Sequence, residues 1–288
     1  MRIGIAGTDG GIKNGHAKSI CTMLLGGEFS DQVTVVMGND EEETRAIAEL
    51  CGKETYIARN IDEFLERCDA VMVLYRNGNL HADVAVSALE ANKAVFVDKP
   101  LACDMKDAKR IVDAAKQNHA LLHSGSSLSY VPALDEIREL VKENGEVQSV
   151  YLAFPLLDQP QHGGIHFYSH HILAEYATVF QDEICSLTAK RVNDNIVILA
   201  DCGRFPILMN CATSYEGLHF GVYFANRKSF MKEITLQDCA KRQIMHFLAS
   251  AKEGVLPTDY DTQLTPVILS CAMEESLKTG TTVTVEYK

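Results

Sequence analysis

The chain has 288 residues and a formal charge of −12, from 27 Lys and Arg against 39 Asp and Glu. The basic residues are scattered, which argues against nucleic-acid binding, and the acidic balance argues against binding to anionic membranes. No apolar run approaches the roughly 20 residues of a membrane span. The nine cysteines are odd in number and show no C-x-x-C spacing, so we expect reduced thiols in a cytoplasmic protein.

The first half of the sequence alternates strand and helix patterns. Helical spacing of apolar residues predicts helices over 41–51, 81–91 and 104–117. Apolar strands that alternate with helices indicate a doubly wound parallel sheet of the Rossmann type, because such a sheet is buried on both faces. Residues 1–6 are already the first strand, so no signal peptide is expected. The expected strands cover residues 2–6, 33–37, 69–75, 94–97 and 120–123.

The second half changes to alternating apolar and polar residues, which is typical of an antiparallel sheet with one face in solvent. We expect an α+β domain built on a large, mostly antiparallel sheet. The boundary is placed in the small polar stretch 124–129, which gives domains 1–125 and 126–288. The expected strands are 147–154, 184–192, 196–201, 207–214, 219–225 and 282–287, and the expected helices are 131–143, 236–252 and 261–278.

A glycine-rich loop joins the first strand to a helix that starts near His16. Glycines let a backbone approach a pyrophosphate, and the N–H groups of a helix N-terminus stabilise its charge. The spacing does not match G-x-G-x-x-G cleanly, so a plain turn is the alternative, and His16 then simply caps it. Asp9 is compatible with a pyrophosphate only if its side chain points away. The residues expected at the cofactor are Gly7, Thr8, Asp9, Gly10, Gly11 and His16.

The end of the second strand usually carries an acidic residue that binds the adenosine ribose. By its spacing to the following helix, Gly38 takes that position here. Asn39 or Asp40 is expected to replace the acid. The choice between NAD and NADP stays open, with NAD favoured because no Arg follows directly to hold a 2′-phosphate.

Two segments resemble motifs of the Gfo/Idh/MocA family, the group of glucose-fructose oxidoreductases and inositol dehydrogenases. Asp98-Lys99-Pro100 resembles the family's Glu-Lys-Pro segment, and residues 75–81 resemble its Thr-Pro-Asn-x-x-His turn. The match runs in order over about residues 1–125 and continues more loosely to the end. There are departures: Asp replaces Glu at position 98, Arg76 stands where Pro is expected, and the glycine loop is one residue longer.

The resemblance implies a catalytic lysine. In the family the Lys of this motif lies beside the nicotinamide and the substrate hydroxyl, often with a cis peptide bond before the Pro. Carried to Lys99, a partly desolvated amine with a lowered pKa would hold the reacting oxygen or relay its proton, with Asp98 beside it. A surface lysine in a turn is the alternative. Further cofactor contacts implied by the resemblance are Tyr75, Arg76, Asn77, His81, Lys99 and Pro100.

Four histidines lie within residues 162–171, where the family carries an Asp-x-Gly-x-His pattern. If Phe180-Gln181 matches the family's helix end, His171 is the catalytic acid/base; a shift by one residue selects His170 instead. We prefer His171 because the helix end agrees, although the motif's Asp is absent in either register. The expected substrate contacts are His162, His166 and Tyr168. Zinc binding by 162, 166 and 170 is the competing interpretation, but Gly163-Gly164 interrupts that face and we expect no metal.

These features together predict an NAD(P)-dependent dehydrogenase that oxidises a secondary hydroxyl of a sugar, cyclitol or related polyol. The family resemblance implies a homo-oligomer, a dimer or a tetramer. Two other functions stay open. One is a non-catalytic NAD(P)-binding sensor or regulatory protein, and the other is an NAD-dependent glycoside-cleaving enzyme on the same fold.

Overall fold

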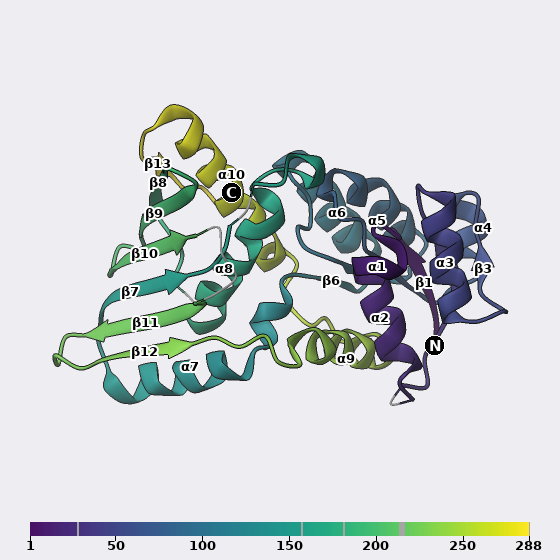
Figure 1. Cartoon of the computed structure of the whole chain (residues 1–288), viewed down its shortest axis with the longest axis horizontal. Coiled ribbons are helices and arrows are strands. Elements are labelled where there is room, and N and C mark those ends of the chain that lie inside the picture. Colours follow the sequence, from purple (N-terminus) through teal and green to yellow (C-terminus); the bar gives the residue numbers. More distant parts are fainter. Residues whose placement is uncertain (28, 157, 181, 213–216, 288) are drawn as a thin grey trace. The chain divides into compact units, whose positions relative to one another are not determined.

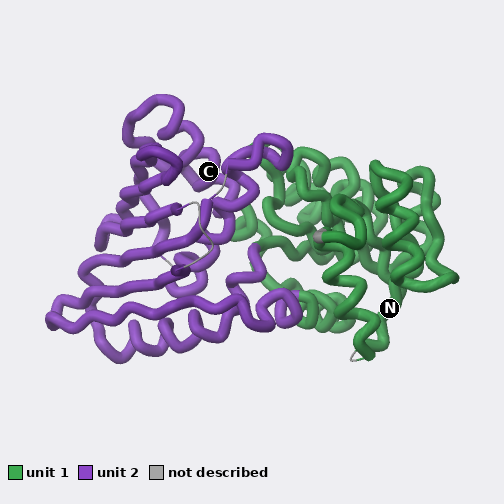
Figure 2. The backbone as a smooth tube through the Cα atoms, in the orientation of Figure 1, with its two compact units in different colours: residues 1–125, 244–264 green, residues 126–243, 265–288 purple. Residues whose placement is uncertain are grey.

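The computed structural model describes the chain except residues 28, 157, 181, 213–216 and 288. It divides into two compact units, residues 1–125 with 244–264 and residues 126–243 with 265–288 (Figure 2). The chain passes from unit 1 to unit 2 after Gly125 and returns to unit 1 for residues 244–264. In the part of the chain that is described, no helix is long and apolar enough to cross a membrane.

Unit 1 contains, within its described residues, a six-stranded sheet in the order β3-β2-β1-β4-β5-β6. Every pairing in it is parallel. The strand order reverses beside β1, which is the Rossmann arrangement, so the predicted fold class of this half is confirmed. The strands are β1 (Arg2–Ala6), β2 (Gln32–Met37), β3 (Tyr56–Ile57), β4 (Ala70–Val73), β5 (Ala94–Val97) and β6 (Leu122–Ser124).

Helices cover this sheet, and several of them begin at a side-chain cap. The Asp40 side chain accepts a hydrogen bond from Glu43 N at the start of α3, and Asp104 does the same for Asp107 N at α6. Phe247 of α9 packs on Phe96 of β5, which explains why residues 244–264 belong to this unit. The helices are α1 (Gly11–Asn14), α2 (His16–Leu25), α3 (Glu41–Cys51), α4 (Ile61–Leu65), η1 (Gly78–Leu80), α5 (His81–Glu90), α6 (Met105–Asn118), α9 (Cys239–Glu253) and η4 (Asp261–Leu264).

Unit 2 is built on a seven-stranded sheet of described residues, in the order β12-β11-β7-β10-β9-β8-β13. Only β7 and β10 pair in parallel; the other pairings are antiparallel, as predicted. Part of the expected strand 207–214 lies outside the described residues. The strands are β7 (Val147–Ala153), β8 (Ser186–Val192), β9 (Asn195–Asp201), β10 (Pro206–Cys211), β11 (His219–Phe224), β12 (Ser229–Glu233) and β13 (Val283–Thr284).

One face of the unit 2 sheet is covered by helices and the other is open (Figure 1). α8 packs on β7, and α10 packs on both α8 and β8. Alternate residues of the strands, such as Ile196, Ile198 and Ala200 of β9, point into this covered core. The helices are η2 (Ser127–Tyr130), α7 (Pro132–Asn144), η3 (Pro160–His162), α8 (His166–Val179) and α10 (Thr265–Thr279).

Candidate functional site

The glycine loop between β1 and α2 has a backbone that other residues could not adopt. Gly7 has φ +97°, and a Cβ there would overlap the backbone nitrogen of Tyr75. A Cβ at Gly15 would lie 2.6 Å from the Asp9 carbonyl oxygen. α2 begins directly afterwards, and no side chain caps its N-terminus. Its first N–H groups are therefore available to an anion such as a pyrophosphate.

Asp9 is held by the turn that follows β4. Its Oδ2 accepts a hydrogen bond of 2.8 Å from the backbone N–H of Arg76. The negative charge is thus compensated on the β4 side of the loop by a backbone donor. This is the condition under which an acidic residue in the loop is compatible with a bound pyrophosphate.

The end of β2 has no room for an acidic side chain. A Cβ at Gly38 would overlap Thr8 Oγ1 and lie 2.5 Å from Thr44 Oγ1. The two threonine hydroxyls are hydrogen-bonded at 2.9 Å, and Thr44 Oγ1 donates to the Asp40 carbonyl at 2.6 Å. Asp40 uses its side chain to cap α3. Asn39 is exposed.

Glu43, which the sequence reasoning missed, contacts the glycine loop. Its Oε2 accepts a hydrogen bond of 3.1 Å from the backbone N–H of Gly10. The only signal in the sequence was an acidic residue in the first turn of a helix, and that is also the ordinary pattern of a stabilised helix N-terminus.

The Asp98-Lys99-Pro100 turn follows β5, at the same edge of the sheet as the glycine loop. The Lys99–Pro100 peptide bond is cis. Lys99 is 3% exposed, and this burial lowers the pKa of its amine to about 8, although the charge of Asp98 opposes the shift. An amine with this pKa exchanges a proton near neutral pH, as acid/base chemistry requires.

Asp98 is paired with His16, the first residue of α2. His16 Nδ1 and Asp98 Oδ2 are hydrogen-bonded. Burial alone would raise the pKa of Asp98, but the charge of His16 and this hydrogen bond, together with the charge of Lys99, hold it below its ordinary range. Asp98 therefore stays ionised and supplies a fixed negative charge beside Lys99.

His81 connects the two turns that resemble family motifs. It is fully buried, with Nδ1 2.8 Å from the Pro100 carbonyl oxygen and Nε2 2.7 Å from the Tyr75 carbonyl oxygen. These contacts fix the turn after β4 to the turn after β5, so His81 positions backbone and has no exposed surface for a cofactor. Asn77 Oδ1 accepts from Asn79 N and starts η1.

The histidine cluster lies in unit 2, at the start of α8. His171 is partly exposed, and its Nδ1 is 2.6 Å from Ser126 Oγ. Its ring contacts Phe154, with 5.3 Å between centroids, and faces Tyr168 at 6.2 Å. His170 is only 2% exposed. Of the two alternatives for the acid/base, His171 is the one with access to solvent. Ser126 was missed because it lies in a stretch interpreted only as a domain boundary.

The other two histidines of the cluster differ in their surroundings. His166 is buried, and its Nδ1 is 2.9 Å from Ser270 Oγ of α10, which ties α8 to α10. His162 ends η3 and packs on Phe167, with 5.3 Å between ring centroids. Gln181, part of the helix end used for the register, lies outside the described residues. Within those that are described, no three His, Cys, Asp or Glu side chains are grouped so as to hold a metal ion.

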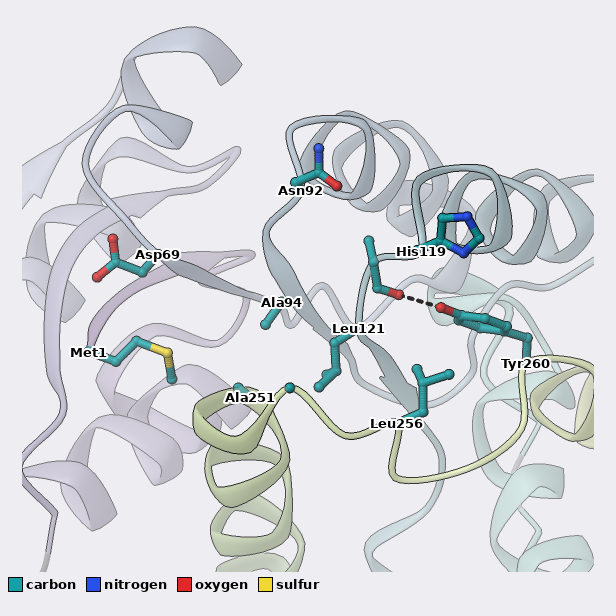
Figure 3. Close-up of a pocket in the computed structure, with 11 residues that line it drawn as sticks. Met1, Asp69, Asn92, Ala94, His119, Leu121, Ala251, Leu256 and Tyr260 are labelled. Atoms are coloured by element: carbon teal, nitrogen blue, oxygen red, sulfur yellow. Dashed lines mark hydrogen bonds between the residues drawn. The ribbon is translucent and has the colours of Figure 1, made fainter.

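A hollow of about 610 Å³ lies at the opposite, N-terminal edge of the parallel sheet of unit 1 (Figure 3). Tyr260 lines it and donates a hydrogen bond to the Ala120 carbonyl oxygen at 2.9 Å. Ligands of open parallel sheets bind at the carboxyl ends of the strands, so this hollow is not the candidate site. Its lining residues include Met1, Asp69, Asn92, Ala94, His119, Leu121, Ala251 and Leu256.

The family model described as "Oxidoreductase family, NAD-binding Rossmann fold" matches residues 1–126. Over this segment the chain matches the Gfo/Idh/MocA family. The resemblance inferred from the sequence is thereby confirmed. An uncharacterized oxidoreductase of Streptococcus pneumoniae is 28% identical over 116 residues, which are 40% of this chain and 31% of that protein. Inositol 2-dehydrogenase 3 of Saccharopolyspora erythraea is 31% identical over 146 residues, which are 50% of this chain and 41% of that protein. The matches thus span less than half of these relatives.

The similarity in fold to solved structures covers nearly the whole chain, unit 1 and unit 2 alike. Myo-inositol 2-dehydrogenase from Lactobacillus plantarum has a TM-score of 0.84 at 12% identity, with 99% of each chain covered. Myo-inositol dehydrogenase from Lactobacillus casei, solved with NAD(H) and myo-inositol, has a TM-score of 0.83 at 16% identity, covering 99% of this chain and 97% of that one. At these identities the comparison establishes the fold.

Proposed function

We propose that the protein is an NAD(H)-dependent oxidoreductase that transfers a hydride between the nicotinamide and a secondary hydroxyl of a cyclitol, sugar or related polyol. The observation that carries this proposal is Lys99, a buried amine with a pKa of about 8 at the carboxyl edge of the parallel sheet. Surface lysines do not lose their solvation in this way, whereas acid/base lysines do. The family of residues 1–126 and the named activity of its inositol dehydrogenase relatives support the same reaction class.

The residues at the glycine loop fit a dinucleotide. Gly7 and Gly15 exclude side chains from the loop, the N-terminus of α2 is uncapped, and Asp9 is held at the Arg76 amide. The backbone of the glycine loop and the first N–H groups of α2 would bind the pyrophosphate. Tyr75 and Pro100 belong to the turns at the same edge of the sheet. When bound, the nicotinamide supplies the hydride acceptor or donor.

Lys99 and His171 have separate roles in the proposal. The neutral Lys99 amine, which its lowered pKa makes accessible near pH 8, accepts the hydroxyl proton as the alcohol is oxidised. His171, which is partly exposed, is the base that next passes this proton to solvent. When its Nδ1 donates to Ser126 Oγ, Nε2 carries the lone pair that takes a proton. Asp98 acts through Lys99, because its charge opposes the loss of the lysine proton.

Turnover by the purified 288-residue chain tests these roles. Nicotinamide absorbance is followed with myo-inositol and a panel of polyols, and cofactor affinity is measured by calorimetry. Lys99→Met and His171→Gln should each lower kcat about 100-fold or more, as removal of a general acid/base does. NADH affinity should change by no more than about threefold, since neither substitution alters the glycine loop.

Matched variants separate a specific effect from a general one. Lys93→Met removes a lysine at the other edge of the sheet, where Lys93 Nζ donates to the Cys68 carbonyl at 3.0 Å, and should leave kcat unchanged. The oxidation rate of the wild type should rise as pH increases through about 8, because only the neutral amine accepts a proton. Full activity of both the Lys99 and His171 variants would overturn the proposal. NADH binding without hydride transfer would instead support a sensor, and release of a free sugar without net reduction would support glycoside cleavage.

The open face of the unit 2 sheet supports the proposed self-association. Leu199 of β9 and Leu208 of β10 are register partners on this face, and Tyr223 and Met231 extend the exposed apolar row onto β11 and β12. Half-buried Tyr151 of β7 is the register partner of Leu208 and lies between these two parts of the row. Apolar residues gathered on an exposed face mark an interaction surface. A second copy of the same chain covers it in the proposed dimer or tetramer.

A further inference from the structure

The adenosine end of the proposed cofactor site lacks the acid that dinucleotide-binding folds place at the end of the second strand. Gly38 takes that position, and the Thr8 and Thr44 hydroxyls fill the space that a side chain would need. The site therefore cannot recognise the ribose in the usual way. Another group must do so, or the site has no means of distinguishing a ribose hydroxyl from a ribose phosphate.

Glu43 is the carboxylate that reaches the glycine loop from the β2 side. Its Oε2 accepts from Gly10 N at 3.1 Å, and a Cβ at Gly11 would lie 3.3 Å from Glu43 Cγ. α3 and the loop thus pack closely at this point. Oε1 accepts no hydrogen bond from any residue the structure describes, so it retains its capacity for a ligand hydroxyl.

Neighbouring groups do not compete for this role. The Asp40 carboxylate caps α3 through Oδ1 and is exposed, whereas the Glu43 side chain is half-buried and packs against Gly10 and Gly11 of the loop. Asn39 is exposed and uncharged. The four consecutive acids 40–43 outnumber the two bases on α1 and α3, Lys13 and Arg45, so the local field disfavours an added phosphate dianion.

We propose that Glu43 selects NAD(H) over NADP(H) by accepting hydrogen bonds from the adenosine ribose hydroxyls, in place of the absent acid at the end of β2. The inference rests on the proposed function. A carboxylate gains a charge-assisted hydrogen bond from a 2′-hydroxyl, whereas it repels a 2′-phosphate at the same distance. One residue therefore raises affinity for NADH and lowers affinity for NADPH.

The test is the dissociation constant of each nucleotide, measured by calorimetry on wild type and Glu43→Gln. Glutamine keeps the side-chain shape and removes the charge. Affinity for NADH should fall about tenfold, the usual effect of losing a hydrogen bond to a charged group, and affinity for NADPH should rise. Glu43→Lys should invert the preference, because it replaces repulsion of the phosphate by attraction. Glu42→Gln removes the same charge from an exposed neighbour and should leave the ratio of the two constants within about twofold.

A fall in NADH affinity together with a rise in NADPH affinity distinguishes recognition of the ribose from an effect on folding. If Glu43 served only to hold the loop through Gly10 N, both nucleotides would weaken together in Glu43→Gln, and the inference would be overturned. A folded Glu43→Gln variant with an unchanged ratio of the NADH and NADPH dissociation constants would overturn the inference as well. If the wild type binds neither nucleotide, the proposed function itself is overturned. If the wild type binds NADH and the ratio of the NADH and NADPH dissociation constants does not depend on Glu43, only the role of this residue is overturned.

Discussion

Glu175 carries an ionisable group into the core of unit 2. It lies on α8 with 0% exposure, and neither of its carboxylate oxygens has a hydrogen-bond partner among the residues that the structure describes. Burial raises the pKa of this carboxyl well above its ordinary value of 4.5. The folded protein therefore keeps a proton on Glu175 at pH values where the unfolded chain has lost it.

This difference makes the free energy of unfolding depend on pH, with a definite sign. Below pH 4.5 Glu175 is largely protonated in both the folded and the unfolded state, so folding requires no uptake of a proton there. Between 4.5 and the raised pKa, the folded state binds more protons, so the free energy of unfolding falls as pH rises, by about 1.4 kcal/mol per pH unit. Glu175→Gln removes this dependence. The difference in free energy of unfolding between the variant and wild type should therefore grow by at most about 2.7 kcal/mol from pH 5 to pH 7, in favour of the variant.

Urea unfolding followed by far-UV circular dichroism at pH 5, 6 and 7 measures this gain, and it suits a chain without Trp. The glutamine amide is also buried without partners, which costs about 1–3 kcal/mol at every pH, so the change with pH is the quantity to compare. Glu143→Gln, an exposed position on α7, should run parallel to wild type. If Glu175→Gln also runs parallel to wild type, the carboxyl is ionised in the folded state and the reasoning is wrong.

Two further predictions concern the cofactor edge and the open sheet. Gly38→Asp restores the usual acid in sequence, but its Cβ overlaps Thr8 Oγ1, so the free energy of unfolding measured in urea should fall by about 1–3 kcal/mol. Combining it with Thr8→Gly should recover part of that loss. Unchanged stability of Gly38→Asp would show that the site has room for the acid. Leu208→Lys places a charge in the apolar row of the unit 2 sheet and should shift the sedimentation equilibrium toward monomer, whereas Lys142→Ala on α7 should not; a wild-type monomer would overturn the proposed oligomer.

The parallel sheet of unit 1 could be predicted because strands buried on both faces appear as short apolar runs. β1, β2, β4 and β5 all have this form. β3 has only two residues, both exposed, and β12 alternates half-buried and exposed residues, so neither differs from a loop in composition. The return of residues 244–264 to unit 1 was also beyond prediction, because the amphipathic pattern of α9 does not say which core its apolar face joins.

In the candidate site, too, a motif that is contiguous in the sequence could be predicted, whereas contacts between residues far apart in the sequence could not. Asp98-Lys99-Pro100 could be found because it is contiguous and follows a strand. The direction of the Asp9 side chain and the pairing of His16 with Asp98 depend on the turns after β4 and β5, which lie far away in sequence. His81 was interpreted as a cofactor contact, yet its two nitrogens face backbone carbonyl oxygens. Motif matching identifies such a residue without revealing that it acts through the backbone.

Two departures from the family pattern were inferred from the sequence, a longer glycine loop and no acid at the end of β2, and the contacts of the loop bear on both. Residues 11–14 of the loop form α1, which packs on α3, and Gly10 N lies within hydrogen-bond distance of Glu43. The same arrangement directs Thr8 over Gly38, where it bonds Thr44 and removes the space for a strand-end acid. A carboxylate on α3 is the group that such a loop can still reach. We therefore expect the two departures to be coupled, so that shortening the loop without restoring an acid at position 38 would weaken NADH binding more than Glu43→Gln alone.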